Sequence, residues 1–221
     1  MLYIVPTPIG NLEDVTERAK QTLGVCDFIV CENPSQTAKL LQLLGLPKKQ
    51  LIQLADFNEQ KTVPQVIERL AKENACLVSD AGTPTISDPG FKLVRACREA
   101  SIEVVSLPGA NAVTTALAAS GLPTDKFIFV GFLPKTEPKV NKLLEEAKSI
   151  EATFIAYESP QRISKTISFI EKSFPECKAV IAREISKIHE EYLIGSPAEV
   201  SEKLKAKPSI KGEIVLLVSF K

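Results

Sequence analysis

The feature that most restricts the fold of this 221-residue chain is a repeated alternation in its first half. Short apolar runs at residues 2–5, 28–31 and 75–78 each lead into a polar loop and then into a stretch with helical spacing. Strands that alternate with helices in this way are typical of a mainly parallel sheet covered by helices. The sequence therefore predicts an α/β domain in the first half.

The polar loops of this half all follow predicted strands, and they are residues 6–11, 32–35, 79–84 and 108–112. The carboxyl ends of parallel strands lie at one edge of the sheet, where open α/β folds bind their ligands. We therefore expect the four loops to surround one crevice. None of them carries G-x-G-x-x-G or the Walker pattern, so neither a Rossmann dinucleotide site nor a P-loop is predicted.

The loop at residues 79–90 has the sequence SDAGTPTISDPG, which is small and polar almost throughout. Its glycines let a ligand approach the backbone closely. Asp88 is expected to cap the following helix, with Pro89 in the first turn. Asp80 has no comparable structural role, so we interpret it as a cofactor or active-site residue. The alternative is that Asp80 only stabilises a turn.

The second half contains apolar runs at residues 127–132, 153–157, 179–182 and 212–218, with residues 191–195 expected to pair antiparallel with a neighbour. Such hairpin-like neighbours predict a second α/β domain with a mixed sheet. The loop that ends the first unit suggests domains at residues 1–122 and 123–221.

The charges balance, with 27 Lys and Arg against 27 Asp and Glu. Tight non-specific binding to nucleic acid depends on neutralising phosphates, so this balance argues against it. A local patch remains compatible with zero net charge. Lys135, Lys139 and Lys142 form a basic run that is either a solvated helix face or a surface facing RNA.

The five cysteines are odd in number, and most lie in or beside apolar runs, so we expect buried thiols in a reducing compartment. There is no C-x-x-C pair, and His189 is the only histidine, which argues against a metal site. We interpret His189 as a surface residue. No apolar run approaches the roughly 20 residues of a membrane helix, and residues 1–6 do not resemble a signal peptide. A cytoplasmic protein without a membrane partner is expected.

Six motifs, in order along the chain, resemble those of the tetrapyrrole-methylase superfamily. The resemblance is strongest to its branch of 16S rRNA cytidine ribose 2′-O-methyltransferases and runs from residue 2 to about residue 218. The motifs are TPIGNLED at 7–14, SDAGTPTISDPG at 79–90, LPG at 107–109, SGLPTD at 120–125, YESP at 157–160 and ARE at 182–184.

The resemblance implies two α/β domains with S-adenosylmethionine in the cleft between them, and a homodimer. It also implies a set of cofactor-binding residues drawn from both domains. These are Pro8, Asp80, Gly82, Ile86, Pro108, Gly109, Ala182, Lys211, Gly212 and Glu213.

The implied reaction transfers the methyl group to a cytidine ribose 2′-hydroxyl of small-subunit ribosomal RNA, without a metal. The reaction depends on placing the oxygen in line with the carbon–sulfur bond and on removing its proton. The candidate catalytic residues are Glu32, Asp80 and Arg162. Glu32 is equally well explained as an ordinary strand-end residue, and Arg162 as a structural partner of Glu158.

Several positions depart from the family pattern. Residues 32–35 are ENPS where the family typically has EDTR, Gln161 replaces a histidine, and Thr85 replaces a usual glycine. A C-terminal extension common in the family has no counterpart. Two alternatives follow: a methylase of a small molecule such as a tetrapyrrole, and a cofactor-binding paralogue without activity on ribosomal RNA.

Overall fold

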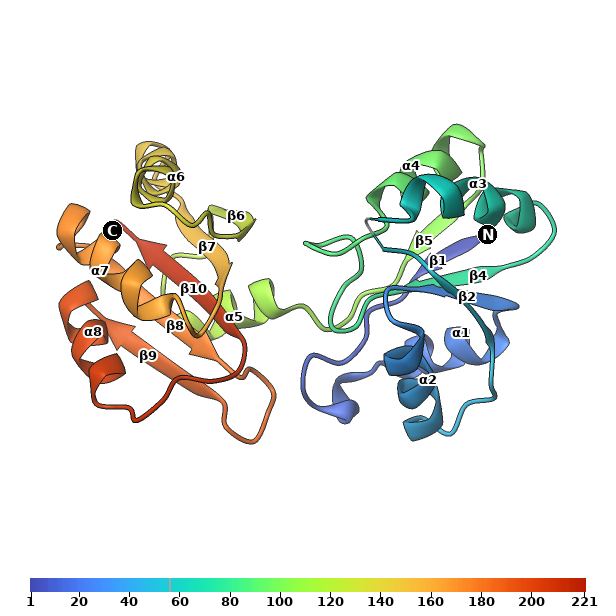
Figure 1. Ribbon diagram of the computed structural model, residues 1–221, viewed down its shortest axis with the longest axis horizontal. Helices are drawn as coiled ribbons and strands as arrows, with labels where there is room; N and C mark the ends of the chain where they lie inside the picture. Colours follow the sequence, from blue (N-terminus) through green and yellow to red (C-terminus); the bar gives the residue numbers. More distant parts are fainter. Residues whose placement is uncertain (56) are drawn as a thin grey trace. The chain divides into compact units, whose positions relative to one another are not determined.

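The computed structural model describes residues 1–55 and 57–221, and these form two compact units, residues 1–111 and residues 112–221 (Figure 1). Each unit contains one five-stranded sheet with helices packed against it. The predicted α/β class is therefore confirmed.

The sheet of the first unit has the strand order β3-β2-β4-β1-β5, and every pair of neighbours is parallel. Its strands are β1 (Leu2–Ile4), β2 (Phe28–Cys31), β3 (Gln50–Gln53), β4 (Ala75–Val78) and β5 (Val104–Ser106). All residues of β2 and β4 are buried. This explains their continuous apolar runs, because helices cover both faces of the sheet.

One face of this sheet packs against α3 (Glu59–Leu70) and α4 (Phe91–Glu99), and the other packs against α1 (Glu17–Val25) and α2 (Pro34–Leu43) (Figure 1). Before α1 the structure has a short 3₁₀ turn, η1 (Leu12–Asp14), and α1 begins after Thr16, whose hydroxyl accepts a hydrogen bond from the Ala19 N–H at 3.1 Å. This N-cap satisfies a free amide of the first turn and sets the start of the helix.

The sheet of the second unit has the order β6-β7-β10-β8-β9. Its strands are β6 (Phe127–Phe132), β7 (Thr153–Glu158), β8 (Lys178–Arg183), β9 (Glu191–Gly195) and β10 (Ile214–Ser219). β6 runs parallel to β7, whereas β10 is antiparallel to β7 and β8, and β9 is antiparallel to β8. The predicted mixed sheet and the antiparallel pairing of residues 191–195 are confirmed.

The core of the second unit lies between this sheet and three helices, α6 (Glu137–Ser149), α7 (Ile163–Ser173) and α8 (Pro197–Lys205). A fourth helix, α5 (Ala112–Ser120), contacts β10, β7 and β8 through buried residues that include Ala116. α5 therefore belongs to the second unit, and the division falls after residue 111 instead of the expected residue 122.

All five cysteines are buried free thiols, as expected. Within the described part of the chain, no helix has the length and apolar character that crossing a bilayer requires.

Candidate functional site

Three strand-end loops of the first unit are tied together by hydrogen bonds. Thr7 and Gly82 each donate a backbone N–H to the carbonyl of the other, at 2.9 Å. The Thr7 hydroxyl also donates to the Ser79 carbonyl at 3.1 Å, and the Thr83 hydroxyl donates to the Ala110 carbonyl at 2.9 Å. The loops that follow β1, β4 and β5 thus form one polar surface at the carboxyl edge of the sheet, as the alternation predicted.

Two glycines allow the close approach of these loops. Gly82 has φ +80°, and a Cβ there would lie 3.3 Å from the Cγ2 of Ile9. A Cβ at Gly109 would lie only 2.7 Å from the Cβ of Pro6. The backbone conformation and close packing therefore explain glycine at both positions without a ligand. Pro108 and Gly109 are exposed at the edge of the sheet.

Asp80 follows β4 directly and lies at the amino end of α2. Its carboxylate accepts a backbone hydrogen bond from Asn33, the N-cap residue of α2. Partial burial raises the pKa of Asp80, and the hydrogen bond from Asn33 opposes that rise. The side chain is nevertheless exposed, so this carboxylate is available to a ligand.

Asp88 does not cap α4, so that expectation was wrong. The N-cap is Gly90, with φ +120°, and α4 has no side-chain cap. The Asp88 carboxylate instead accepts a hydrogen bond from the Ser79 side chain. Burial, together with the charges of Glu32 and Asp80, raises the pKa of Asp88 to about 6 despite that bond.

Glu32, Asp80 and Asp88 therefore form a group of interacting carboxylates at the ends of β2 and β4. Sequence reasoning brought Glu32 and Asp80 together but missed Asp88, because Asp-Pro-Gly before a helix is explained equally well by capping. Asp88 joins this group because its loop folds back toward Ser79, and no local sequence pattern indicates that fold.

The backbone between these acids is strained. Thr85 has φ +74° and Ser87 has φ +72°, and together they flank Ile86, whose side chain is 40% exposed. The left-handed region is unfavourable for a β-branched residue, and such strain concentrates at functional sites. The glycine usual at position 85 in the resembled family would remove the strain at that residue.

The candidate residues of the second unit occupy the ends of β8 and β10. Glu184 donates its N–H to the Glu213 carbonyl, and the Glu213 N–H donates to the Glu184 carboxylate, both at 3.0 Å. Gly212 has φ +92°, and a Cβ there would overlap the Glu184 carboxyl group. Ala182 is fully buried between β10 and β9, so the exposed atoms of this edge belong to residues 211–213.

Lys187 forms ion pairs with two glutamates of this segment. Lys187 Nζ lies 2.7 Å from the Glu184 carboxylate and 3.0 Å from that of Glu213. The hydrogen bond from Lys187 lowers the pKa of Glu184. The structure thus places the Lys211–Glu213 segment against Glu184 within the second unit.

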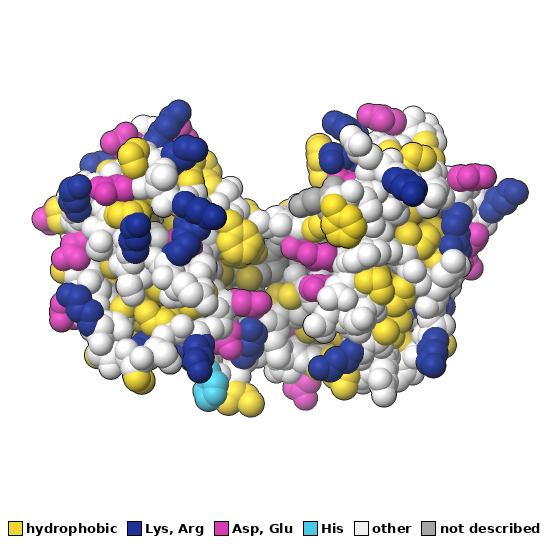
Figure 2. Space-filling model, in the orientation of Figure 1, with side chains coloured by type: hydrophobic (Ala, Val, Ile, Leu, Met, Phe, Trp, Pro, Cys, Tyr) yellow, Lys and Arg dark blue, Asp and Glu magenta, His cyan; other side chains and the backbone are white. Residues whose placement is uncertain are grey.

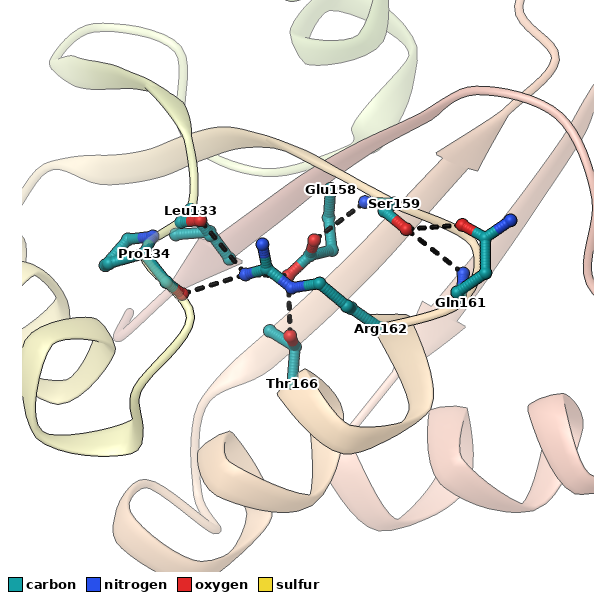
Figure 3. Close-up of polar contacts among 7 residues, drawn as sticks. All are labelled: Leu133, Pro134, Glu158, Ser159, Gln161, Arg162 and Thr166. Atoms are coloured by element: carbon teal, nitrogen blue, oxygen red, sulfur yellow. Dashed lines mark hydrogen bonds and ion pairs between the residues drawn. The ribbon is translucent and has the colours of Figure 1, made fainter.

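Arg162 is held in a structural network (Figure 3). Its guanidinium donates to the carbonyls of Leu133 at 3.0 Å and Pro134 at 2.8 Å, and it pairs with the Glu158 carboxylate at 3.2 Å. The structural pairing considered from the sequence is therefore formed. A catalytic role of Arg162 stays a prediction, and this residue belongs to the second unit whereas Glu32 and Asp80 belong to the first.

Glu158 is the centre of that network. It is 3% exposed, and it accepts hydrogen bonds from the Thr166 hydroxyl at 2.6 Å and from the Ser159 N–H at 2.7 Å (Figure 3). A buried carboxylate is tolerated because each oxygen has donors and Arg162 supplies the opposite charge.

Surface charge is mixed. On the face drawn in Figure 2, lysine and arginine side chains lie among aspartate and glutamate side chains on both units. Lys135, Lys139 and Lys142 are exposed, and His189 is exposed as expected. The described residues contain no group of three or more His, Cys, Asp or Glu that could hold a metal ion.

The family model of the Tetrapyrrole (Corrin/Porphyrin) Methylases matches residues 1–201. The chain belongs to this family. Among similar proteins is a "Ribosomal RNA small subunit methyltransferase I" from Hydrogenobaculum sp. (strain Y04AAS1), which is 46% identical over 99% of this chain and 95% of its own length. A protein of the same name from Pasteurella multocida (strain Pm70) is 45% identical over 100% of this chain and 79% of its own.

Solved structures agree on the fold of this family member. A crystal structure of diphthine synthase matches with a TM-score of 0.77 over 99% of this chain and 89% of that chain. The two sequences are only 13% identical, so the match concerns architecture alone.

Proposed function

We propose that the chain is an S-adenosylmethionine-dependent methyltransferase that methylates the ribose 2′-hydroxyl of a cytidine in small-subunit ribosomal RNA. The observation that carries the proposal is the full-length similarity to proteins named for methylation of small-subunit ribosomal RNA. The joined loops of the first unit support it, because they present a carboxylate, exposed backbone and an apolar side chain at one sheet edge.

The residues present fit the proposed cofactor. The Asp80 carboxylate can accept hydrogen bonds from its hydroxyl or ammonium groups, and the exposed backbone at Pro108 and Gly109 can bond its base. Pro8 and Ile86 offer apolar contact, and Gly82 lets the loop after β4 approach the loop after β1. When bound, S-adenosylmethionine supplies a methyl group activated by a positively charged sulfur. Ala182, Lys211, Gly212 and Glu213 complete the proposed set.

The chemistry requires a positioned oxygen and a proton acceptor. The new bond forms between the ribose oxygen and the methyl carbon as the carbon–sulfur bond breaks, with its electron pair passing to sulfur. The hydroxyl proton must leave, and a carboxylate can accept it. Glu32 and Asp80 are the proposed acceptors in the first unit, and Arg162 is the remaining candidate for contact with the acceptor substrate.

The proposal is tested by transfer of a tritiated methyl group to 30S subunits that lack the modification. Primer extension sensitive to ribose methylation then maps the product. We expect transfer to a single cytidine. No transfer at saturating cofactor would reject the proposed activity.

The cofactor site is tested separately by calorimetry. Asp80→Asn should weaken binding of S-adenosylmethionine about tenfold or more, since hydrogen bonds to charged groups contribute about 1.5–3 kcal/mol. Asp125→Asn, at an exposed position of the second unit, is the matched control and should bind normally. Equal affinity of the two variants would remove Asp80 from the site.

A second candidate is a cofactor-binding protein without activity on ribosomal RNA. It is favoured by the hydrogen bonds of Asn33 and Gln161, two residues that depart from the family pattern. The Asn33 side chain accepts from the Ser35 N–H at 3.1 Å, and Gln161 accepts from the Ser159 hydroxyl at 2.5 Å, so both have local structural bonds. Tight cofactor binding without transfer to any RNA would support this candidate. We also propose that the protein is cytoplasmic and that it forms a homodimer. Light scattering would test the homodimer.

A further inference from the structure

A pocket of about 270 Å³ lies beside Asp80 in the first unit, and the proposed cofactor contacts do not account for most of it. It is lined by the loop after β1, by one side of α2 and by the end of β4. It shares Pro8 and Asp80 with the proposed cofactor residues. A ligand in this pocket would therefore lie next to the proposed site of methyl transfer.

α2 contributes five residues to the pocket, namely Gln36, Thr37, Lys39, Leu40 and Leu43. Lys39, Leu40 and Leu43 lie three, four and seven residues after Gln36, and this spacing places the four on one face of the helix. Leu43 is 58% exposed, although leucine on a helix face normally packs against the core. This face of α2 therefore offers apolar surface that the fold of the first unit leaves uncovered.

The polar residues of the same helix face are available for a ligand. Gln36 and Lys39 are exposed, and among the described residues neither forms a side-chain hydrogen bond or an ion pair. A lysine ammonium is a point charge suited to a phosphate, and an amide can donate and accept at the edge of a base. The helix face thus combines a cation, an amide and an apolar surface.

The size of the pocket limits its occupant. Its volume of about 270 Å³ is slightly below the roughly 300–1,000 Å³ typical of pockets for drug-sized ligands. A macrocycle such as a tetrapyrrole is too large, whereas a single nucleotide is of the right size. Enzymes that act on a base of a nucleic acid turn the target nucleotide out of its stack and bind it in a pocket, and a ribose can be presented to an active site in the same way.

We propose that this pocket binds one nucleotide of the RNA acceptor, with the base against Leu40 and Leu43 and a phosphate at Lys39. Gln36 contacts the edge of the base, and the ribose lies toward Asp80. The inference rests on the proposed function and adds the place where the acceptor binds. It assigns Lys39 to substrate binding, not to the chemical step.

Lys39→Glu tests the assignment, and Lys61→Glu is the matched control. Lys61 is also an exposed lysine on a helix of the first unit, but α3 covers the opposite face of the sheet. The measurements are KM and kcat for 30S subunits, together with the affinity for S-adenosylmethionine by calorimetry. Thermal unfolding of each variant confirms that it is folded.

We expect Lys39→Glu to raise KM for 30S subunits at least tenfold, with kcat and cofactor affinity within twofold of wild type. The dependence of log affinity on log salt should also lose about one unit of slope, as removal of one phosphate contact predicts. Leu43→Gln should raise KM through lost contact with the base, and Lys61→Glu should change neither parameter.

Two results would overturn the inference. Equal KM values for Lys39→Glu and Lys61→Glu would show that the pocket does not bind the acceptor. A parallel loss of cofactor affinity in Lys39→Glu would assign the pocket to the cofactor. Failure of the proposed function is a different observation, namely no methyl transfer by the wild-type protein, and it would reject both proposals.

Discussion

Thr7 and Gly82 exchange two backbone hydrogen bonds of 2.9 Å and form a short antiparallel bridge between two loops. The same threonine donates its hydroxyl to the Ser79 carbonyl, and it is only 2% exposed. The loop that carries Pro8 is therefore fixed to the loop that carries Asp80 by three hydrogen bonds. Residues of two strand-end loops are thus positioned as one rigid surface.

Removing the Thr7 hydroxyl tests this connection. Thr7→Val keeps the shape of the side chain but leaves the Ser79 carbonyl without this donor, and an unsatisfied buried group costs about 1–3 kcal/mol. We expect the free energy of unfolding in urea to fall by that amount and the affinity for S-adenosylmethionine to fall with it. Thr7→Ser retains the hydroxyl and serves as the control. Equal affinities in the two variants would contradict a role of this bond in the site.

Thr85 provides a test of stored strain. Its φ of +74° is unfavourable by about 1–2 kcal/mol for residues other than glycine, whereas glycine adds about 0.5–1 kcal/mol of chain entropy to the unfolded state. We therefore expect Thr85→Gly to stabilise the protein by about 0.5–1 kcal/mol, measured as a higher midpoint of urea unfolding.

The matched control for Thr85→Gly is Thr83→Gly in the same loop. Thr83 does not have a positive φ, and its hydroxyl donates to the Ala110 carbonyl, so glycine there should lower stability. If both variants were destabilised equally, the left-handed backbone at Thr85 would carry no measurable strain.

The parallel sheet of the first unit could be anticipated from the sequence. β2 and β4 are continuous apolar runs, and alternation with helices indicates parallel strands, but it does not determine the strand order β3-β2-β4-β1-β5. The attachment of α5 could not be anticipated. Its alanines indicated close packing, but a small-residue helix next to a domain boundary fits either sheet, and only the contacts with β10, β7 and β8 decide.

The site was predictable to the extent that it follows strand ends. Asp80 and the glycines lie where the topology requires, because the ends of parallel strands share an edge. Asp88 was assigned to a cap because local sequence favours one. Between Ser79 and Asp88 the backbone is left-handed at Thr85 and Ser87. A left-handed conformation is predictable from sequence mainly at glycine, so threonine and serine gave no indication of it.

Arg162 allows a structural role to be separated from a catalytic one. Arg162→Met removes the charge that pairs with the buried Glu158 and the donor to two carbonyls. Breaking a buried pair costs about 3–5 kcal/mol, and the partial exposure of Arg162 reduces this to about 2–3 kcal/mol. We expect unfolding at correspondingly lower urea concentration.

The discriminating measurement on Arg162→Met is methyl transfer per folded molecule, well below the unfolding transition. A structural residue leaves kcat largely intact once the protein is folded, whereas a catalytic one does not. Glu158→Gln should also lower stability, since it leaves Arg162 without its partner. Unchanged stability in both variants would contradict the network of Figure 3.

Asp88 should make stability depend on pH. Burial raises the pKa of its carboxyl group in the folded protein from 3.8 to about 6, so the folded state binds the proton more tightly than the unfolded state does. The contribution of Asp88 to stability should therefore be most favourable below about pH 4, fall as pH rises to about 6, and stay reduced above that. Asp88→Asn removes this loss and can still accept from Ser79.

We expect Asp88→Asn to be more stable than wild type by about 1–2 kcal/mol at pH 7.5. The full shift from 3.8 to about 6 would correspond to about 3 kcal/mol at 1.36 kcal/mol per pKa unit, and the partial exposure of Asp88 reduces this. The difference should disappear at pH 4. Urea unfolding at both pH values provides the measurement, with the exposed Asp125→Asn as control. A constant difference between Asp88→Asn and wild type across this range would show that the Asp88 carboxyl does not titrate there.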